Sequence, residues 1–331
     1  MRPRALLFSP PGLRQHIFPA EVLAEIAQVA DCPWPVIDPA DPREFAGPLR
    51  EADVIFSTWG MPTMSEEFLK SAPALKAVFY AAGSVKGFVT DAAWDRGIVV
   101  SSAWAANGVP VAEYSLATIL LSLKRFWHFS RAMRHPKASS AEIRVPGAFR
   151  SKVGLVSLGA TGRATAKLLA PFEVELLAFD PFLPADQAAG LGVRLVTLDE
   201  LFRECDVISI HSPWIPETER MINGKLISSM KPGATLINSS RGAVVAEDEL
   251  IEILKIRPDL SAVLDVSFPE PPAGDSPLRS LPNVVLTPHI AGSMQGECTR
   301  MACWMVAELR RYLNSEPLLH AVSRDLLARM A

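Results

Sequence analysis

The stretch Val153-Gly154-Leu155-Val156-Ser157-Leu158-Gly159-Ala160-Thr161-Gly162-Arg163 decides the fold of this 331-residue chain. A short apolar run with strand character leads into a glycine-rich turn, and helical periodicity begins after it. Glycines let such a turn bend and let backbone N–H groups approach a phosphate at the start of the helix, where the helix dipole favours negative charge. The stretch therefore predicts a strand, a turn and a helix that bind the pyrophosphate of a dinucleotide.

The turn departs from the G-x-G-x-x-G pattern at its first position, which is Ser157, whereas Gly159 and Gly162 are in place. Asp180 ends the next predicted strand, 18 residues after Gly162. A carboxylate there can accept hydrogen bonds from the adenosine ribose and repels a 2′-phosphate. We therefore expect NAD (NADH) as the cofactor rather than NADP, with binding weakened but not abolished by Ser157.

Strand and helix patterns alternate on both sides of this turn. The predicted strands are 153–158, 174–179, 207–210, 235–238, 262–266 and 284–286. Helical periodicity lies near 163–169, 198–203, 222–230 and 247–255, and the proline-rich stretch 268–282 predicts a loop. Short β-branched runs that alternate with helices predict an α/β fold, a Rossmann doubly wound parallel sheet.

The first hundred residues repeat this rhythm less clearly, with strand candidates at 5–8, 54–57, 77–80 and 98–101. They predict a second, smaller α/β domain. An apolar helical stretch near 110–133 follows, with Pro110 suited to its first turn. We interpret it as a helix that links the two domains and is available for a dimer contact.

Composition excludes several classes of function. Hydrophobic residues make up 49% of the chain, but no charge-free apolar run reaches the length of about 18 residues that a membrane span needs. The net charge of −3, with scattered Lys and Arg, predicts no nucleic-acid partner. The four cysteines are far apart or five residues apart, without a CxxC pair or a neighbouring His cluster. We expect free thiols in a reducing cytoplasm, no secretory leader and no metal site.

Further motifs follow the later strands. They are His211-Ser212-Pro213-Trp214-Ile215-Pro216-Glu217-Thr218, Met230-Lys231-Pro232-Gly233-Ala234, Asn238-Ser239-Ser240-Arg241-Gly242, Leu264-Asp265-Val266-Ser267-Phe268-Pro269-Glu270-Pro271, and Leu286-Thr287-Pro288-His289-Ile290-Ala291-Gly292. Together, and in this order, they closely resemble the D-isomer-specific 2-hydroxyacid dehydrogenase family. The resemblance covers essentially the whole chain and is strongest from Val153 to Gly292.

The resemblance implies a catalytic group of Arg241, Glu270 and His289. Arg241 would hold the substrate carboxylate and polarise the carbonyl, as suits a permanently charged, fork-shaped donor. His289 would exchange a proton with the substrate oxygen during hydride transfer. Glu270 would accept a hydrogen bond from the other imidazole nitrogen, orient the ring and favour its protonated form. Each of these residues alone is commonly structural, and only their joint occurrence in family order makes coincidence improbable.

The resemblance also assigns binding residues. The cofactor set is Gly159, Ala160, Thr161, Gly162, Asp180, Ser212, Pro213, Thr218, Ser239, Ser240, Asp265 and Gly292. Among these, Asp265 would lie beside the nicotinamide carboxamide. The substrate set is Ala82, Gly83, Ser84, Trp59 and Trp104, together with Arg241. A flavodoxin-like substrate domain would comprise 1–107 and 288–331, with the NAD-binding domain 108–287 inserted in it and the active site in the cleft between them.

Departures from the family pattern bear on the substrate. Phosphoglycerate-type relatives carry arginines near positions that are Phe56 or Ser57 and Ala81 here, which argues against a phosphorylated acid. The tryptophans Trp59, Trp104 and Trp214 favour an apolar or bulky side group, although tryptophan is more often a core residue. The expected function is therefore reversible reduction of a small, non-phosphorylated 2-oxo acid by a homodimer.

Other functions stay open. They are a corepressor-like sensor of NAD(H), and, within the family, a phosphoglycerate dehydrogenase or a glyoxylate/hydroxypyruvate reductase. A formate-dehydrogenase-like role is disfavoured because that branch has glutamine where Glu270 stands.

Overall fold

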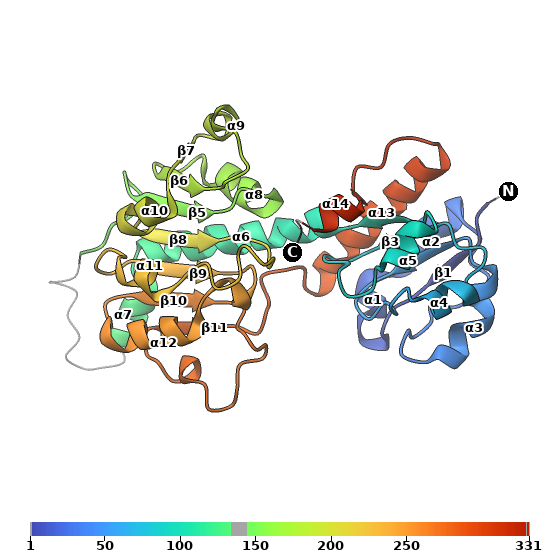
Figure 1. Cartoon of the computed structure of the whole chain (residues 1–331), viewed down its shortest axis with the longest axis horizontal. Coiled ribbons are helices and arrows are strands. Elements are labelled where there is room, and N and C mark those ends of the chain that lie inside the picture. The colour runs from blue at the N-terminus through green and yellow to red at the C-terminus, as the bar shows by residue number, and fades with distance from the viewer. Residues whose placement is uncertain (1, 134–143, 329, 331) are drawn as a thin grey trace. The chain divides into compact units, whose positions relative to one another are not determined.

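The computed structural model describes residues 2–133, 144–328 and 330 (Figure 1). The remaining residues of the two expected domains, at 1, 134–143, 329 and 331, lie outside the described residues. The chain forms two compact units, one of Met1–Asn107 with Ser293–Met330 and one of Gly108–Gly292.

The first unit contains a five-stranded sheet in the order β1-β2-β3-β4-β12. Its strands are β1 (Ala5–Leu7), β2 (Val54–Ser57), β3 (Ala77–Tyr80), β4 (Val99–Ser102) and the antiparallel β12 (Ala321–Val322). Its helices are α1 (Pro11–Ile17), α2 (Ala20–Val29), α3 (Pro42–Glu51), α4 (Glu66–Ser71), α5 (Asp91–Asp95), α13 (Cys298–Leu313) and α14 (Arg324–Leu327), with a 3-10 turn η3 (Gln295–Glu297).

Apolar side chains project from both faces of this sheet. Leu6, Ile55 and Val78 pack with α3 to α5, and the alternate residues Leu7 and Phe56 belong to a second cluster with α1, α2 and α13. A parallel sheet buried on both faces needs such continuous apolar runs.

Two parallel bridges, Arg4 to Asp31 and Phe8 to Ile37, place the segment 31–37 along β1. Counted as a strand, this segment gives the 2-1-3-4-5 order of a flavodoxin-like sheet. The expected smaller α/β domain is confirmed.

The second unit contains a parallel seven-stranded sheet in the order β11-β10-β9-β8-β5-β6-β7. Its strands are β5 (Lys152–Val156), β6 (Glu175–Phe179), β7 (Val193–Leu195), β8 (Val207–Ile210), β9 (Thr235–Asn238), β10 (Ser261–Leu264) and β11 (Val284–Leu286). The order from β7 to β10 is the doubly wound 3-2-1-4-5-6 pattern, so the predicted Rossmann sheet is confirmed. Its topological switch point lies between β5 and β8, where ligands bind in such folds.

Helices supply the covering layers of this sheet. They are α6 (Trp104–Leu123), which crosses the boundary between the units, α7 (Phe126–Ala132), α8 (Ala160–Leu169), α9 (Ala185–Gly190), α10 (Leu198–Glu204), α11 (Gly224–Ser228) and α12 (Glu247–Ile256), with 3-10 turns η1 (Gly242–Val244) and η2 (Pro277–Arg279). Leu155 and Ile237 share a cluster with α6, α8 and α9, whereas Ile208 and Leu236 share one with α10 to α12.

Some local predictions were wrong. The linking helix does not open at Pro110: it begins at Trp104, so Pro110 lies inside α6. The helix also ends at Leu123, because Arg125 adopts a left-handed backbone with φ 55° before α7 begins. The short β7 and α9 were not predicted, and three residues around the exposed Arg194 are too few to show an alternating pattern.

We expected the NAD-binding domain to end at residue 287, whereas the second unit ends five residues later, at Gly292. The backbone N–H groups of His289, Ile290 and Ala291 all bond to Asp265. These hydrogen bonds keep the loop after β11 with the second unit.

Candidate active site

The dinucleotide turn joins β5 to α8 and has the geometry that its glycines predict. A Cβ atom on Gly162 would collide with the carbonyl oxygen of Ser157, so only glycine fits there. Gly159 is the N-cap of α8 and is exposed, and a Cβ atom built on it meets no atom within 4 Å. Ala160 and Thr161 follow in the first turn of the helix. The helix start is therefore open to a ligand on the side of Gly159.

Ser157 carries the strain that a glycine would avoid. Its φ is 75°, in the left-handed region, and its backbone N–H bonds to Phe179 of the neighbouring strand at 2.8 Å. Its hydroxyl lies 2.8 Å from the hydroxyl of Ser212, in the loop after β8. The predicted alteration of the turn is thus a serine forced into a glycine conformation.

Asp180 ties together the loops that follow β5 and β6. Its Oδ2 accepts the N–H of Leu158 at 2.7 Å, and its Oδ1 accepts the N–H groups of Phe182 at 2.9 Å and Leu183 at 3.0 Å. The side chain is half-buried, and Oδ2 accepts one of these three hydrogen bonds while Oδ1 accepts the other two. It can therefore still accept a hydrogen bond from a ribose hydroxyl.

The loop after β8 contains three predicted cofactor residues. Ser212 is buried, and Pro213 is braced by Thr218, whose hydroxyl donates to the Pro213 carbonyl at 2.6 Å. Burial lowers the pKa of His211 to about 4, and its Nε2 has no hydrogen-bond partner among the described residues. The imidazole is therefore neutral at physiological pH. The hydrogen bonds of the Thr218 hydroxyl within this loop hold the loop's shape.

The loop after β9 carries Arg241. Asn238 shapes it, since its Oδ1 accepts the N–H of Ser240 at 3.0 Å and its Nδ2 donates to the carbonyl of Arg241 at 3.0 Å. Ser239 is buried and lies 3.4 Å from Ser115 of α6 between hydroxyl oxygens. Burial lowers the pKa of Arg241 and the nearby Glu270 carboxylate opposes that shift, so the guanidinium stays charged beside Glu270.

His289 and Glu270 form a direct pair. The Nδ1 of His289 lies 2.6 Å from Oε1 of Glu270, and both side chains are exposed by 47% and 39%. The carboxylate accepts the Nδ1–H, which fixes the ring and leaves Nε2 free for a substrate oxygen. His289 has a φ of 56°, so its backbone is strained as well.

Asp265 holds the loop that carries His289. It is 1% exposed, and its carboxylate accepts the Thr287 hydroxyl at 2.6 Å and the N–H groups of Ile290 and Ala291, each at 2.8 Å. Tyr114 of α6 lies 3.3 Å from the Thr287 hydroxyl. From its position we expected Asp265 to contact the cofactor, and neither its bracing of this loop nor the contributions of Thr287 and Tyr114 were predicted. Thr287 stood inside a quoted motif, but nothing in that motif showed its partner.

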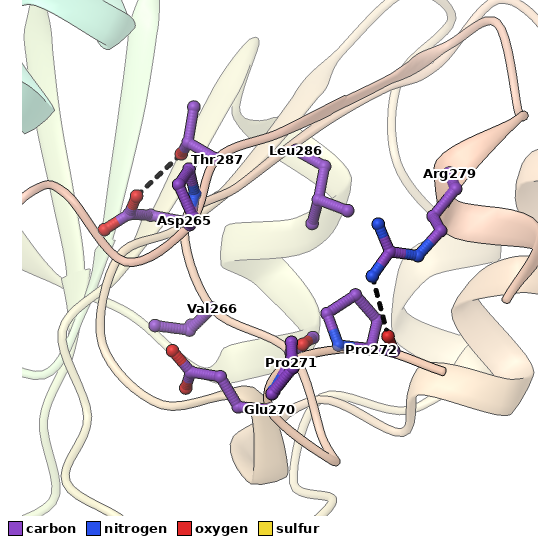
Figure 2. A pocket seen from close by; sticks show the side chains of 10 residues that line it. Asp265, Val266, Glu270, Pro271, Pro272, Arg279, Leu286 and Thr287 are labelled. Carbon is purple, nitrogen blue, oxygen red and sulfur yellow. Dashed lines mark hydrogen bonds between the residues drawn. The ribbon is translucent and has the colours of Figure 1, made fainter. Parts of the chain in front are cut away.

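A cavity of about 410 Å³ adjoins this loop (Figure 2). Glu270, Asp265 and Thr287 line it, together with Arg279, which donates hydrogen bonds to the carbonyls of Pro272 and Ala273. Arg279 thereby fixes the proline-rich loop that carries Glu270.

The predicted substrate residues of the first unit are placed as follows. Ala82 is buried, and its carbonyl accepts the Ser102 hydroxyl at 3.0 Å, while Gly83 and Ser84 are half-buried. Trp59 is 36% exposed, and Trp104 is half-buried against His320 with ring centroids 6.4 Å apart. Arg241, Glu270 and His289 belong to the second unit, as does Gly292, its last residue before the crossing. The substrate roles of the first-unit residues stay predictions.

Comparison with known proteins decides the family. Residues 116–291, more than half of the chain, match the model described as D-isomer specific 2-hydroxyacid dehydrogenase, NAD binding domain. The chain belongs to this dehydrogenase family. The matched range holds the dinucleotide turn and all three residues of the predicted catalytic group.

Relatives of this dehydrogenase-family chain include D-3-phosphoglycerate dehydrogenases. The protein from Mycobacterium leprae is 30% identical over 303 residues, which cover 92% of this chain and 57% of the relative. The protein from Synechocystis is 31% identical over 260 residues, or 78% and 47% of the two chains. The chain thus spans about half the length of these curated relatives. Among solved structures, D-mandelate dehydrogenase of Rhodotorula graminis is 25% identical with a TM-score of 0.81, and 98% of each chain is covered.

The residues of the turn fit the family's cofactor. The close backbone approach at Gly162, the open helix start at Gly159 and the half-buried carboxylate of Asp180 are compatible with a dinucleotide's diphosphate and adenosine. No group of three or more His, Cys, Asp or Glu side chains in the described part of the chain is arranged to hold a metal ion. All four cysteines are free thiols. None of the described helices is both long and apolar enough to cross a membrane.

Proposed function

We propose that the protein is an NAD-dependent D-2-hydroxyacid dehydrogenase that interconverts a small 2-hydroxy acid and its 2-oxo acid. The observation that carries this proposal is the 2.6 Å pair of His289 and Glu270 in the same unit as Arg241 and the dinucleotide turn. A proton donor, its orienting carboxylate and a fixed cation are the groups that carbonyl reduction requires from the protein.

Each catalytic residue has a defined task in this proposal. Arg241 pairs with the substrate carboxylate and draws electron density toward the carbonyl oxygen. His289 gives the Nε2 proton to that oxygen in the reductive direction and removes it in the oxidative direction. Glu270 holds the Nδ1–H, so the ring keeps one orientation throughout. Bound NADH supplies the hydride, and bound NAD accepts it in the reverse reaction.

Asp180 supports a preference for NAD over NADP. In this proposal the Asp180 carboxylate lies beside the adenosine ribose, where a 2′-phosphate would be repelled. Phe182, two residues later, is 80% exposed and offers no positive charge to compensate a phosphate. We therefore infer that NADH is the better reductant.

We infer a non-phosphorylated substrate with an apolar or bulky side group. Phe56, Ser57 and Ala81, where phosphoglycerate-type relatives carry arginines, are uncharged and fully buried. Trp214 and Phe268 form an exposed edge-to-face pair with centroids 5.2 Å apart on the loops after β8 and β10. D-Mandelate, the acid named for the structural relative, is aromatic. The curated relatives are D-3-phosphoglycerate dehydrogenases, so D-3-phosphoglycerate is the alternative substrate. Glyoxylate and hydroxypyruvate are further alternatives that the sequence resemblance left open.

A second candidate is a corepressor-like sensor of NAD(H). Such a protein needs the dinucleotide turn but has no use for a complete group of Arg241, Glu270 and His289. The completeness of this group favours the enzyme.

We also infer a homodimer that uses α6 and α7, where Leu121 and Phe126 are exposed by 37% and 44%. Sedimentation should give twice the mass of the chain. A cytoplasmic location stays a prediction.

The deciding experiment follows the loss of NADH absorbance with a panel of 2-oxo acids. The panel contains glyoxylate, hydroxypyruvate, branched and aromatic 2-oxo acids, and phosphohydroxypyruvate. We expect turnover with NADH and the highest kcat/KM for an apolar acid. A preference for phosphohydroxypyruvate or glyoxylate would refute the substrate assignment, whereas tight NADH binding without turnover of any acid would favour the sensor.

A further inference from the structure

The hydroxyl groups of Ser157 and Ser212 form an isolated pair at the dinucleotide turn. Their oxygens are 2.8 Å apart, and neither hydroxyl bonds to any other described residue. Ser212 is 1% exposed, whereas Ser157 is partly exposed. One hydrogen bond joins two groups that carry two hydroxyl hydrogens, so one O–H remains available.

Burial decides which hydrogen remains. If Ser157 donated to Ser212, the hydrogen of the buried Ser212 would have no acceptor, and a buried unsatisfied donor costs about 1–3 kcal/mol. The favoured arrangement therefore has Ser212 donating to Ser157. The hydrogen of Ser157 is then the free one, on the more exposed of the two residues.

The backbone of Ser157 gives an independent observation. Its φ of 75° is one that glycine adopts freely and serine only at a cost of about 1–2 kcal/mol. The strained position is also pressed against α8, since the Ser157 carbonyl occupies the space that a Cβ atom of Gly162 would take. The conformation thus fixes the hydroxyl at the point where the turn meets the start of the helix.

We propose that the Ser157 hydroxyl is a ligand of the cofactor, donating a hydrogen bond to the diphosphate of the bound nicotinamide dinucleotide. The turn is the segment whose backbone approaches that diphosphate in this fold. A charged phosphate oxygen is also a strong acceptor for a hydroxyl that Ser212 already orients. This assignment replaces our expectation that Ser157 weakens cofactor binding. It rests on the NAD-binding domain and not on the identity of the substrate.

Two matched variants separate the hydroxyl from the backbone strain. Ser157→Gly and Ser157→Ala both remove the hydroxyl, but only glycine relieves the positive φ. In NADH fluorescence titrations without substrate, we expect both variants to raise the Kd about tenfold, the loss of one hydrogen bond to a charged group. We expect the glycine variant to melt a few degrees above the alanine variant. Ser212→Ala keeps the Ser157 hydroxyl but removes the hydrogen bond that orients it, so we expect a smaller rise in the Kd than in either Ser157 variant.

Several outcomes would overturn the assignment. NADH binding by Ser157→Gly as tight as in the unmodified protein would show that the hydroxyl contributes nothing. A larger loss in Ser212→Ala than in Ser157→Ala would assign the contact to the other serine. Titration with ADP-ribose, which has the diphosphate but no nicotinamide, should show the same tenfold loss, and an unchanged ADP-ribose Kd would move the contact away from the diphosphate. The proposed function fails separately, if NADH binds in this pattern but no acid is reduced.

Discussion

Asp180 and Asp265 occupy equivalent places in the second unit, but their carboxylates differ in burial. Each lies directly after a strand, β6 or β10, and each accepts hydrogen bonds from the loop that follows the neighbouring strand, β5 or β11. Asp265 is buried and receives three donors from the loop around His289. Asp180 is half-exposed beside an open turn. The same residue type thus fixes the loop that carries His289 in one place and stays accessible to solvent or a ligand in the other.

Between these two aspartates, the larger expected effect is on the Asp265 side. Asp265→Asn replaces one of the two carboxylate oxygens, each of which accepts a backbone N–H, by an NH2 group that cannot accept. The loop that carries His289 should therefore shift. A displacement of about 1 Å at a catalytic group costs about 100-fold in rate, and we expect kcat to fall by about that factor. Steady-state kinetics checks this, and a parallel NADH titration should show a much smaller change. A kcat within threefold of the unmodified value would contradict the bracing role.

On the other side, Asp180→Asn should change the choice of cofactor. Removing the negative charge ends the repulsion of a 2′-phosphate, so we expect the preference for NADH over NADPH to narrow about tenfold. The ratio of kcat/KM for the two cofactors measures this. An unchanged ratio would show that Asp180 only ties the two loops together. The matched contrast is that Asp265→Asn should leave the ratio unaltered.

A smaller effect is expected from the α6 end of the Asp265 network. The Thr287 hydroxyl donates to Asp265, so Tyr114 is the donor to Thr287. Tyr114→Phe removes one long hydrogen bond, of 3.3 Å between the two hydroxyl oxygens, and should lower kcat about threefold. Thr287→Val removes the donor to the buried carboxylate itself and should lower it about tenfold. Equal effects of the two variants would contradict this order.

A pH dependence of stability, rather than of rate, is expected on the dinucleotide side. His211 has a folded-state pKa of about 4, below its ordinary value of 6.5, because burial disfavours the charged ring. The unfolded chain therefore takes up a proton below pH 6.5 that the folded chain refuses, and the free energy of unfolding falls as the pH drops from 6.5 toward 4. In urea unfolding at pH 7.5 and pH 5.0, His211→Gln should lose less stability than the unmodified protein. An equal loss in both proteins would show that His211 is not buried as a neutral ring.

The sequence predicted the regular part of this molecule well for a physical reason. Strands β8 and β9 have their predicted bounds because both faces of a parallel sheet demand unbroken apolar runs. The order of motifs also predicted a catalytic group of Arg241, Glu270 and His289, and this assignment stays a prediction. Their side-chain geometry was a prediction only from family resemblance, and the 2.6 Å pair of Glu270 and His289 is a property of the structure.

The parts that escaped prediction depend on backbone conformation and on partners distant in sequence. The left-handed Arg125 ends α6 although the apolar pattern continues beyond it. The lone pairs of Asp265 are taken by residues 22 to 26 positions later, which no local pattern shows. Likewise, the sequence shows that Ser157 departs from a glycine motif, but it shows neither the φ of Ser157 nor its contact with Ser212.

The most direct test of the central claim is the effect of His289→Gln on turnover and on NADH binding, measured on the same preparation. If the imidazole carries the proton to the substrate oxygen, as proposed, kcat should fall about 1000-fold, and because His289 lies outside the dinucleotide turn the Kd for NADH should change less than twofold. Turnover that survives the substitution would contradict the assignment of acid–base catalysis to the pair of His289 and Glu270.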